Sequence, residues 1–431
     1  MKKIIFILFS LFYFKTLSAE SDLMFFVNSA LEKNPKINAE RQNLKAIKQN
    51  INITRSEFLP SITLEGSQSS KETSKIVDQS GNTSGNTKRN TETKKISVDQ
   101  KIFQGFQGFN NFKKSRLEFE KAKQEYKLIE QEIILESISS YFDLILKKNN
   151  KNFNLANVDL FERQVESDRA RLQKGEITLT DLAQSESSLA GANASLTKSD
   201  TELTASIAEF KRITRISAPA ELNNATPISF SMPSNLMEAL KLSSKNNPNL
   251  SIARINLAIS EKELSIEKSR LSPSATLNYS VTENKDLSAT VDEDEQETVK
   301  ATISWPLIKG GKNYSTIKKF KFKKEQNKLL LADKESEVKT QTATAWSFYQ
   351  SAESVLKSTA SQLKAAEIAN EGITLEYDSG NSRTTLELIQ SRSLLLDARI
   401  SYAKAEKDLV VSKLKLLSQI GGLDLKALKT Q

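Results

Sequence analysis

Ala30-Leu31-Glu32-Lys33-Asn34-Pro35, close to the start of the chain, has a counterpart in the second half, where Ala239-Leu240 is followed by Asn247-Pro248. The separation that relates the two Asn-Pro pairs also relates Pro60 to Pro273. Markers that recur in the same order indicate an internal repeat, so we expect the chain to hold two copies of one structural plan.

Each copy reads as a helix, a strand, a loop, a second strand, a very long helix, a turn and a last helix. The first repeat is predicted over 20–218 and the second over 234–420, with a proline-bearing linker at 219–233 and a short tail at 421–431. Glycine and proline are scarce, with 13 and 8 residues in a chain of 431. This scarcity favours long, uninterrupted helices.

Helical spacing opens each copy, over 22–57 and 234–271, and we expect the prolines that follow to end both helices. The later elements of the first copy are a strand hairpin over 61–103, a long helix over 109–174 and a helix over 178–215. Those of the second copy are a strand hairpin over 274–306, a long helix over 313–378 and a helix over 384–418. At about 1.5 Å per residue, each long helix would be on the order of 100 Å in length.

The long helices carry narrow apolar seams between polar flanks, and small residues gather in their expected partners, as over 190–195. This pattern favours coiled-coil packing around a water-filled space. A solid filament is the simpler alternative, but it leaves the strands and the repeat unexplained. The predicted class is therefore mainly α with a small β part, built from duplicated long-helix hairpins.

The predicted strands alternate between apolar and polar residues. Their apolar residues fall on one face, with Gln100 as the exception: Ile62, Leu64, Ile96, Val98, Ile102, Ala275, Leu277, Tyr279, Val281, Val299, Ala301, Ile303 and Trp305. Such a sheet fits a soluble sandwich or a barrel with lipid outside and water inside. Four strands cannot close a barrel alone, since single chains need about eight, but three chains could close one together.

The tips of both hairpins read as solvated loops. Residues 67–93 are rich in serine, threonine, asparagine, lysine and glycine, and the other tip holds the acidic run 292–295. The acidic run could bind calcium, but it lacks the spaced ligands and the glycine of a calcium loop. Solvated loops are the stronger interpretation for both tips.

Composition narrows the function classes. A basic start, a short apolar run and a small residue at position 19 predict a signal peptide over 1–19, with a retained anchor as the weaker alternative. The chain has no cysteine and no histidine, which makes catalysis and cofactor or metal chemistry unattractive. Its net charge of +9 is spread without a dense basic cluster, so nucleic-acid binding is not indicated.

The paired openings, the proline exits, Phe103-Gln104-Gly105, Ile308-Lys309-Gly310-Gly311 and Gly421-Gly422-Leu423 together resemble the TolC-type outer-membrane efflux proteins, also called outer-membrane factors. The resemblance covers essentially the whole mature chain. It implies a homotrimer with one twelve-stranded transmembrane β-barrel, surrounded by outer-membrane lipid, and a periplasmic α-barrel. It also implies a passive exit duct in a tripartite efflux or type I secretion system, with a periplasmic adaptor and an inner-membrane transporter as partners.

The resemblance places the periplasmic gate at the two glycine turns, Gly175 and Gly380. It implies a latch in which Tyr377 and Arg383 of the second turn face Thr180 and Asp181 of the first. Charge-assisted bonds of this kind are strong but can be broken when a partner docks. The spacings 178–181 and 384–387 are also capping-box spacings, so Asp181 could serve only as a cap. Both interpretations stay open.

Beyond the second turn, Glu387 and Gln390 match positions where some members hold rings of acid that form a constriction in the lumen. Three copies of Glu387 would attract cations, whereas Gln390 departs from the acidic pattern and weakens the ring. A solvated helix face is the alternative for both residues. For the whole chain, the alternative function is a periplasmic adaptor or a structural coiled-coil protein.

Overall fold

The computed structural model describes residues 22–85, 87–219, 230–288, 291–379 and 383–425. In the first repeat the elements are α1 (Asp22–Lys33), α2 (Pro35–Ser56), β1 (Ser61–Thr73), β2 (Ile76–Val77), β3 (Thr83–Ser84), β4 (Thr87–Gln104), α3 (Gln107–Gln173) and α4 (Leu179–Thr214). In the second they are α5 (Leu236–Asn246), α6 (Pro248–Ser269), β5 (Ser274–Lys285), β6 (Glu293–Ser304), α7 (Lys312–Asp378) and α8 (Thr385–Gln419). The expected class, mainly α with a small β part and duplicated long-helix hairpins, is confirmed. The predicted signal peptide lies outside the described residues.

The helix that opens each repeat is broken where one continuous helix was expected. Asn34 separates α1 from α2, and Asn247 separates α5 from α6. The side chain of Asn247 accepts a hydrogen bond from the backbone N–H of Leu250 at 3.1 Å, which caps α6. Proline follows both asparagines and suits the first turn of a helix, where its missing N–H costs nothing. The Asn-Pro pairs therefore start new helices.

The chain forms two compact units, and neither follows a repeat. The first unit takes its described residues from Met1–Asn38, Ile129–Lys245 and Thr340–Gln431. The second comprises Ala39–Leu128 and Asn246–Lys339. Each unit therefore combines parts of both repeats. Among the helices of the described ranges, none is long and apolar enough to cross a membrane.

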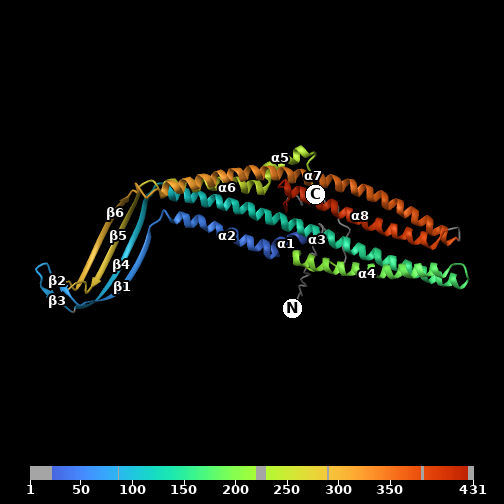
Figure 1. Ribbon diagram of the computed structural model, residues 1–431, viewed down its shortest axis with the longest axis horizontal. Helices are drawn as coiled ribbons and strands as arrows, with labels where there is room; N and C mark the ends of the chain where they lie inside the picture. The colour runs from blue at the N-terminus through green and yellow to red at the C-terminus, as the bar shows by residue number, and fades with distance from the viewer. Residues whose placement is uncertain (1–21, 86, 220–229, 289–290, 380–382, 426–431) are drawn as a thin grey trace, which may run out of the picture. The chain divides into compact units, whose positions relative to one another are not determined.

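The second unit holds an antiparallel four-stranded sheet in the order β1-β4-β5-β6 (Figure 1). The pairing of β4 with β5 joins the two repeats. Val98 lies opposite Tyr279, and Tyr279 lies opposite Val299, so the apolar residues share one face as the alternation predicted. This face is exposed, with Leu64 at 76% and Ile303 at 78% exposure.

Two details of the sheet differ from expectation. A bulge lies between Lys101 and Phe103, so Phe103, not Ile102, comes opposite Ala275 on the apolar face. The strands also run further than their apolar residues do. β1 pairs with β4 out to Thr73 and Thr87, and Glu293 starts β6 opposite Lys285. The polar stretches expected as loops are therefore largely paired strand, because backbone bonds form a ladder whichever side chains line it.

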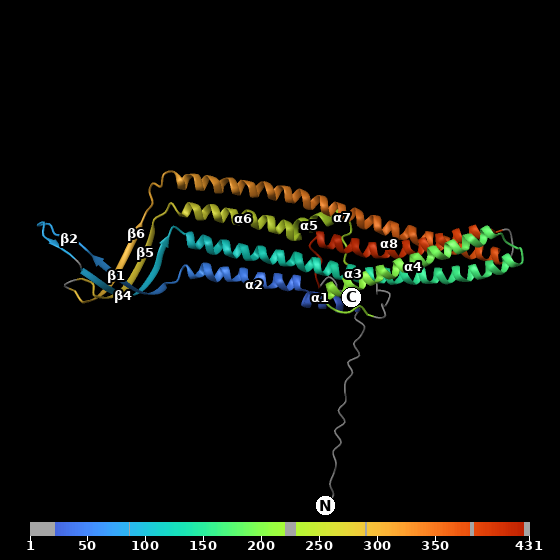
Figure 2. The ribbon, with the colours of Figure 1, turned by 60° about the horizontal axis from the view of Figure 1, so that its bottom comes forward.

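In the second unit, α2, α3, α6 and α7 lie side by side in that order (Figure 2). The hydroxyls of Thr54 on α2 and Ser115 on α3 are 2.8 Å apart. Lys114 on α3 pairs with Glu263 on α6 at 3.0 Å, and Lys324 on α7 pairs with Glu261 on α6 at 3.0 Å. Partly exposed pairs such as these contribute about 1 kcal/mol or less each. They therefore decide which helices lie next to each other more than they stabilise the fold.

The first unit has its own apolar core, where α1, α3 and α4 meet. The rings of Phe26 and Phe210 pack edge to face with centroids 5.0 Å apart, and Tyr141 lies against Phe26 at 5.9 Å. Nearer the turn between α3 and α4, Val158 and Phe161 pack on Ala192. Burial of large apolar side chains contributes about 1.5–3 kcal/mol each, so these clusters hold the helices together.

Candidate functional site at the two helical turns

The turn between α3 and α4 is built from local backbone rules. Gly175 adopts a positive φ of 74°, and its N–H bonds to the carbonyl of Leu172 at 2.9 Å. Glycine suits this left-handed conformation because it has no Cβ to clash. Thr178 then caps α4, while the carboxylate of Asp181 accepts a bond from the Thr178 backbone N–H at 2.9 Å. The capping box predicted from the spacing is present.

The turn between α7 and α8 is followed by a capping box of the same kind. Gly380 lies outside the described residues. Thr384 caps α8, and the carboxylate of Glu387 accepts a bond from the Thr384 backbone N–H at 2.9 Å. Because this bond favours the charged form, it lowers the pKa of Glu387. Bonds from Thr178 likewise lower the pKa of Asp181, and the charge of Arg171 adds to the effect.

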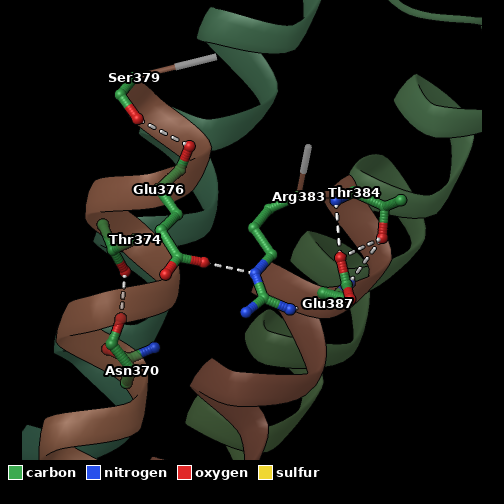
Figure 3. A network of polar contacts seen from close by, with 7 residues as sticks. All are labelled: Asn370, Thr374, Glu376, Ser379, Arg383, Thr384 and Glu387. Carbon is green, nitrogen blue, oxygen red and sulfur yellow. Dashed lines mark hydrogen bonds and ion pairs between the residues drawn. The ribbon is translucent and has the colours of Figure 1, made fainter. Parts of the chain in front are cut away.

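Arg383 lies between two carboxylates of its own turn (Figure 3). Its Nε donates to Glu376 at 2.5 Å, and its Nη1 donates to Glu387 at 3.2 Å. The bond to Glu376 is the main reason that the pKa of Arg383 is raised. All three side chains are exposed to solvent, so the triad can form and break at little cost.

Beneath the turns, a buried polar network joins α3, α4, α7 and α8. The carboxyl group of Asp168 on α3 is fully buried and accepts three hydrogen bonds. Its donors are Gln164 Nε2 at 2.9 Å, the Ser185 hydroxyl at 2.5 Å and the Tyr377 hydroxyl at 3.0 Å. The hydroxyls of Tyr377 and Thr385 are 3.2 Å apart, which brings α8 into the network. Every polar atom that is buried here therefore has a partner.

The environment of Tyr377 keeps its hydroxyl protonated. Burial raises the pKa of Tyr377, and the nearby carboxyl of Asp168 acts in the same direction. The Arg171 guanidinium stacks on the ring, 4.8 Å from its centroid. A protonated hydroxyl can donate to Asp168 at any physiological pH, so the network does not depend on the ionisation of Tyr377.

The structure brings the four predicted latch residues to one end of the first unit, but in the described part of the chain no bond joins those of one turn to those of the other. Tyr377 reaches Asp168 of α3, and Arg383 reaches Glu376 and Glu387. Asp181 serves as the cap of α4, and Thr180 is exposed in its first turn. The latch between the two turns stays a prediction.

The sequence interpretation missed Asp168, Gln164 and Ser185. One signal could have found two of them, since Asp168 and Ser185 stand at equal distances from the turn between Gly175 and Thr178. In a hairpin of two antiparallel helices, residues equally far from the turn lie at the same height. The predicted constriction residues occupy the first turns of α8, where Glu387 takes part in the cap and Gln390 is exposed.

Comparison with known proteins decides the family. The model of the family described as outer membrane efflux protein matches residues 26–214 and 239–422, which is most of the chain and both repeats. The chain belongs to this family. It is 23% identical over 393 residues to the outer membrane efflux protein BepC of Brucella suis, covering 91% of this chain and 83% of BepC. It is 24% identical over 405 residues to the outer membrane protein TolC of Vibrio cholerae, covering 92% and 90%.

Solved structures agree on the fold. The Campylobacter jejuni CmeC outer membrane channel superposes with a TM-score of 0.81 at 14% identity, covering 93% of this chain and 85% of CmeC. The chain therefore has an efflux channel fold. Its family and its relatives place it in the outer membrane, with an extension into the periplasm. The family consists of transport proteins, which favours the channel over the adaptor alternative.

Proposed function

We propose that three copies of this efflux protein assemble into a passive exit duct through the outer membrane. The four-stranded sheet carries the proposal. Within one chain, β1 and β6 are its edge strands, and its apolar face is open to solvent. Long edges and an exposed apolar face invite pairing with further strands and contact with lipid. Three sheets of four strands would close one twelve-stranded barrel, with the apolar face outward.

The opposite face of the sheet suits a water-filled lumen. Ser97 lies opposite Ser280, and Asp99 accepts a bond from Asn278 at 2.8 Å. The long helices would continue this lumen through the periplasm as a hollow cylinder. The family name gives the function as efflux. Efflux through a passive duct needs a source of substrate and of energy, so we assign a periplasmic adaptor and an inner-membrane transporter as partners. Removal of residues 1–19 would accompany export.

The duct is tested with the purified mature chain in detergent and in planar bilayers. We expect a trimer by mass measurement and a large, long-lived conductance when it is inserted. Closing the barrel is the reason for both results, because the outer backbone N–H and C=O groups of both edge strands have no partner strand in a monomer. A soluble monomer that gives no conductance would overturn the proposed function.

Within this duct, we propose that the two turns form the gate. In the assembled tip, the exposed side chain of Arg383 would bind Thr180 and Asp181 of the other turn. The substitution Arg383→Glu places a third carboxylate beside Glu376 and Glu387. Like charges repel, so the closed tip should loosen and the closed-state conductance should rise several-fold.

The control for this variant is Arg163→Glu. Arg163 is an exposed arginine of α3 that pairs with Asp159 one helical turn away. It should leave the closed-state conductance unchanged. A similar rise in both variants, or no rise with Arg383→Glu, would remove Arg383 from the gate.

A further inference from the structure

A basic cleft opens in the second unit where the strands meet the long helices. It has a volume of about 710 Å³, and its lining includes the cationic residues Lys101, Arg270, Lys309 and Lys312. One acid, Glu57, also lines it, and its carboxylate accepts bonds from the Asn111 amide at 3.3 and 3.4 Å. Serine hydroxyls and glutamine amides complete the wall, so the cleft offers many hydrogen-bond donors.

The cations of this cleft are poorly neutralised. Arg270 pairs with Glu267 at 3.3 Å. For Lys101, Lys309 and Lys312, the described part of the chain provides no ion pair, and all three are exposed. Their positive charge is therefore available to a ligand.

A glycine turn brings two of these lysines together. Gly310 and Gly311 have positive φ values of 52° and 77°, and the backbone N–H of Lys312 bonds to the carbonyl of Lys309 at 3.0 Å. Side chains other than glycine rarely adopt this conformation. The turn joins β6 to α7 (Figure 1), and Lys309 and Lys312 at its two ends line the same cleft.

The cleft lies on the polar face of the sheet. Lys101 stands opposite Thr276, and Ser274 stands opposite Ser304, whereas the apolar residues occupy the other face. In the proposed duct this face lines the lumen, and lipid headgroups lie on the apolar side. A soluble anion that enters through the barrel could reach the lysines without passing the tip.

We propose that this cleft is a binding site for soluble polyanions, such as molecules bearing phosphate groups, on their way through the duct. The inference rests on the proposed function, because it takes the polar face as the lumen. Lysine ammonium groups bind phosphate oxygens as point charges, and serine and glutamine side chains add donors. Three copies would place three such clefts around the lumen, which raises the local concentration of anionic cargo.

Isothermal titration calorimetry of the full mature trimer in detergent tests the site, with inorganic tripolyphosphate as the probe. We expect binding that weakens as salt is raised, because ions screen the lysines. The double variant Lys309→Gln and Lys312→Gln should weaken binding about 100-fold, since each charge-assisted contact is worth about tenfold or more. The matched control is Lys318→Gln with Lys319→Gln, two exposed lysines of α7 outside the cleft, which should bind as the unmodified protein does.

Conductance in planar bilayers tests the anion site independently of the duct. Tripolyphosphate added on the barrel side should reduce the current of the unmodified channel and leave that of the Lys309→Gln, Lys312→Gln variant unchanged. A conducting trimer that neither binds nor is blocked by tripolyphosphate would overturn the site and leave the duct standing. Loss of binding to phosphatidylglycerol vesicles in the double variant, with tripolyphosphate binding intact, would also overturn it, since a lipid surface would then be the ligand.

Discussion

The substitution Ala301→Lys should keep this efflux protein out of the outer membrane. Ala301 lies near the middle of the apolar residues of β6, opposite Leu277. A lysine on the lipid face of a barrel costs about 2–4 kcal/mol near the bilayer midplane, and each of three copies would add its own penalty. The expected result is loss of the protein from the outer-membrane fraction and loss of the trimer on gels run without heating.

The next residue provides the matched control. Thr302 lies on the polar face, opposite Thr276, and Thr302→Lys adds the same charge to the same strand. It should reach the outer membrane and conduct, because its ammonium group would face water. If both variants assemble equally well, the apolar face does not contact lipid, and the soluble sandwich considered from the sequence becomes the better interpretation of the sheet.

The sequence predicted the architecture well because the relevant signals are local and repeated. Alternation in 274–282 required only a period of two, and the long helices required only the absence of proline. The Asn-Pro breaks at Asn34 and Asn247 were missed because helical periodicity continues across them. The bulge at Ile102 was missed for a similar reason, since only the register with β5 reveals an extra residue.

The site was predicted less completely, because the buried network at its centre is formed by tertiary contacts. The caps at Thr178 and Thr384 follow from spacing alone, and both are present. Asp168 stands as far before its turn as Ser185 stands after it, but it is one acid among many on a helix of 67 residues. Its burial depends on the meeting of α3, α4, α7 and α8, which no single stretch of sequence encodes.

Magnitudes suggest where the tip is held most firmly. The ion pairs of Arg383 are exposed, and pairs of this kind contribute about 0.2–1 kcal/mol each. The bonds to Asp168 are buried, and a buried donor that loses its acceptor costs about 1–3 kcal/mol. We therefore expect Arg383 to adjust the gate and the Asp168 network to fix the helices that carry it.

The substitution Asp168→Ala should loosen the four helix ends by about 3 kcal/mol, because Gln164, Ser185 and Tyr377 would lose their common acceptor. Amide hydrogen exchange near the turns should then speed up on the order of 100-fold, while the barrel strands should exchange as before. Asp168→Asn, which keeps one acceptor oxygen, should give a smaller change. Asp159→Ala, which removes an exposed acid of α3 that pairs with Arg163, should give almost no change. Equal exchange in Asp168→Ala and the unmodified protein would show that the network, although fully bonded, does not hold the turns together.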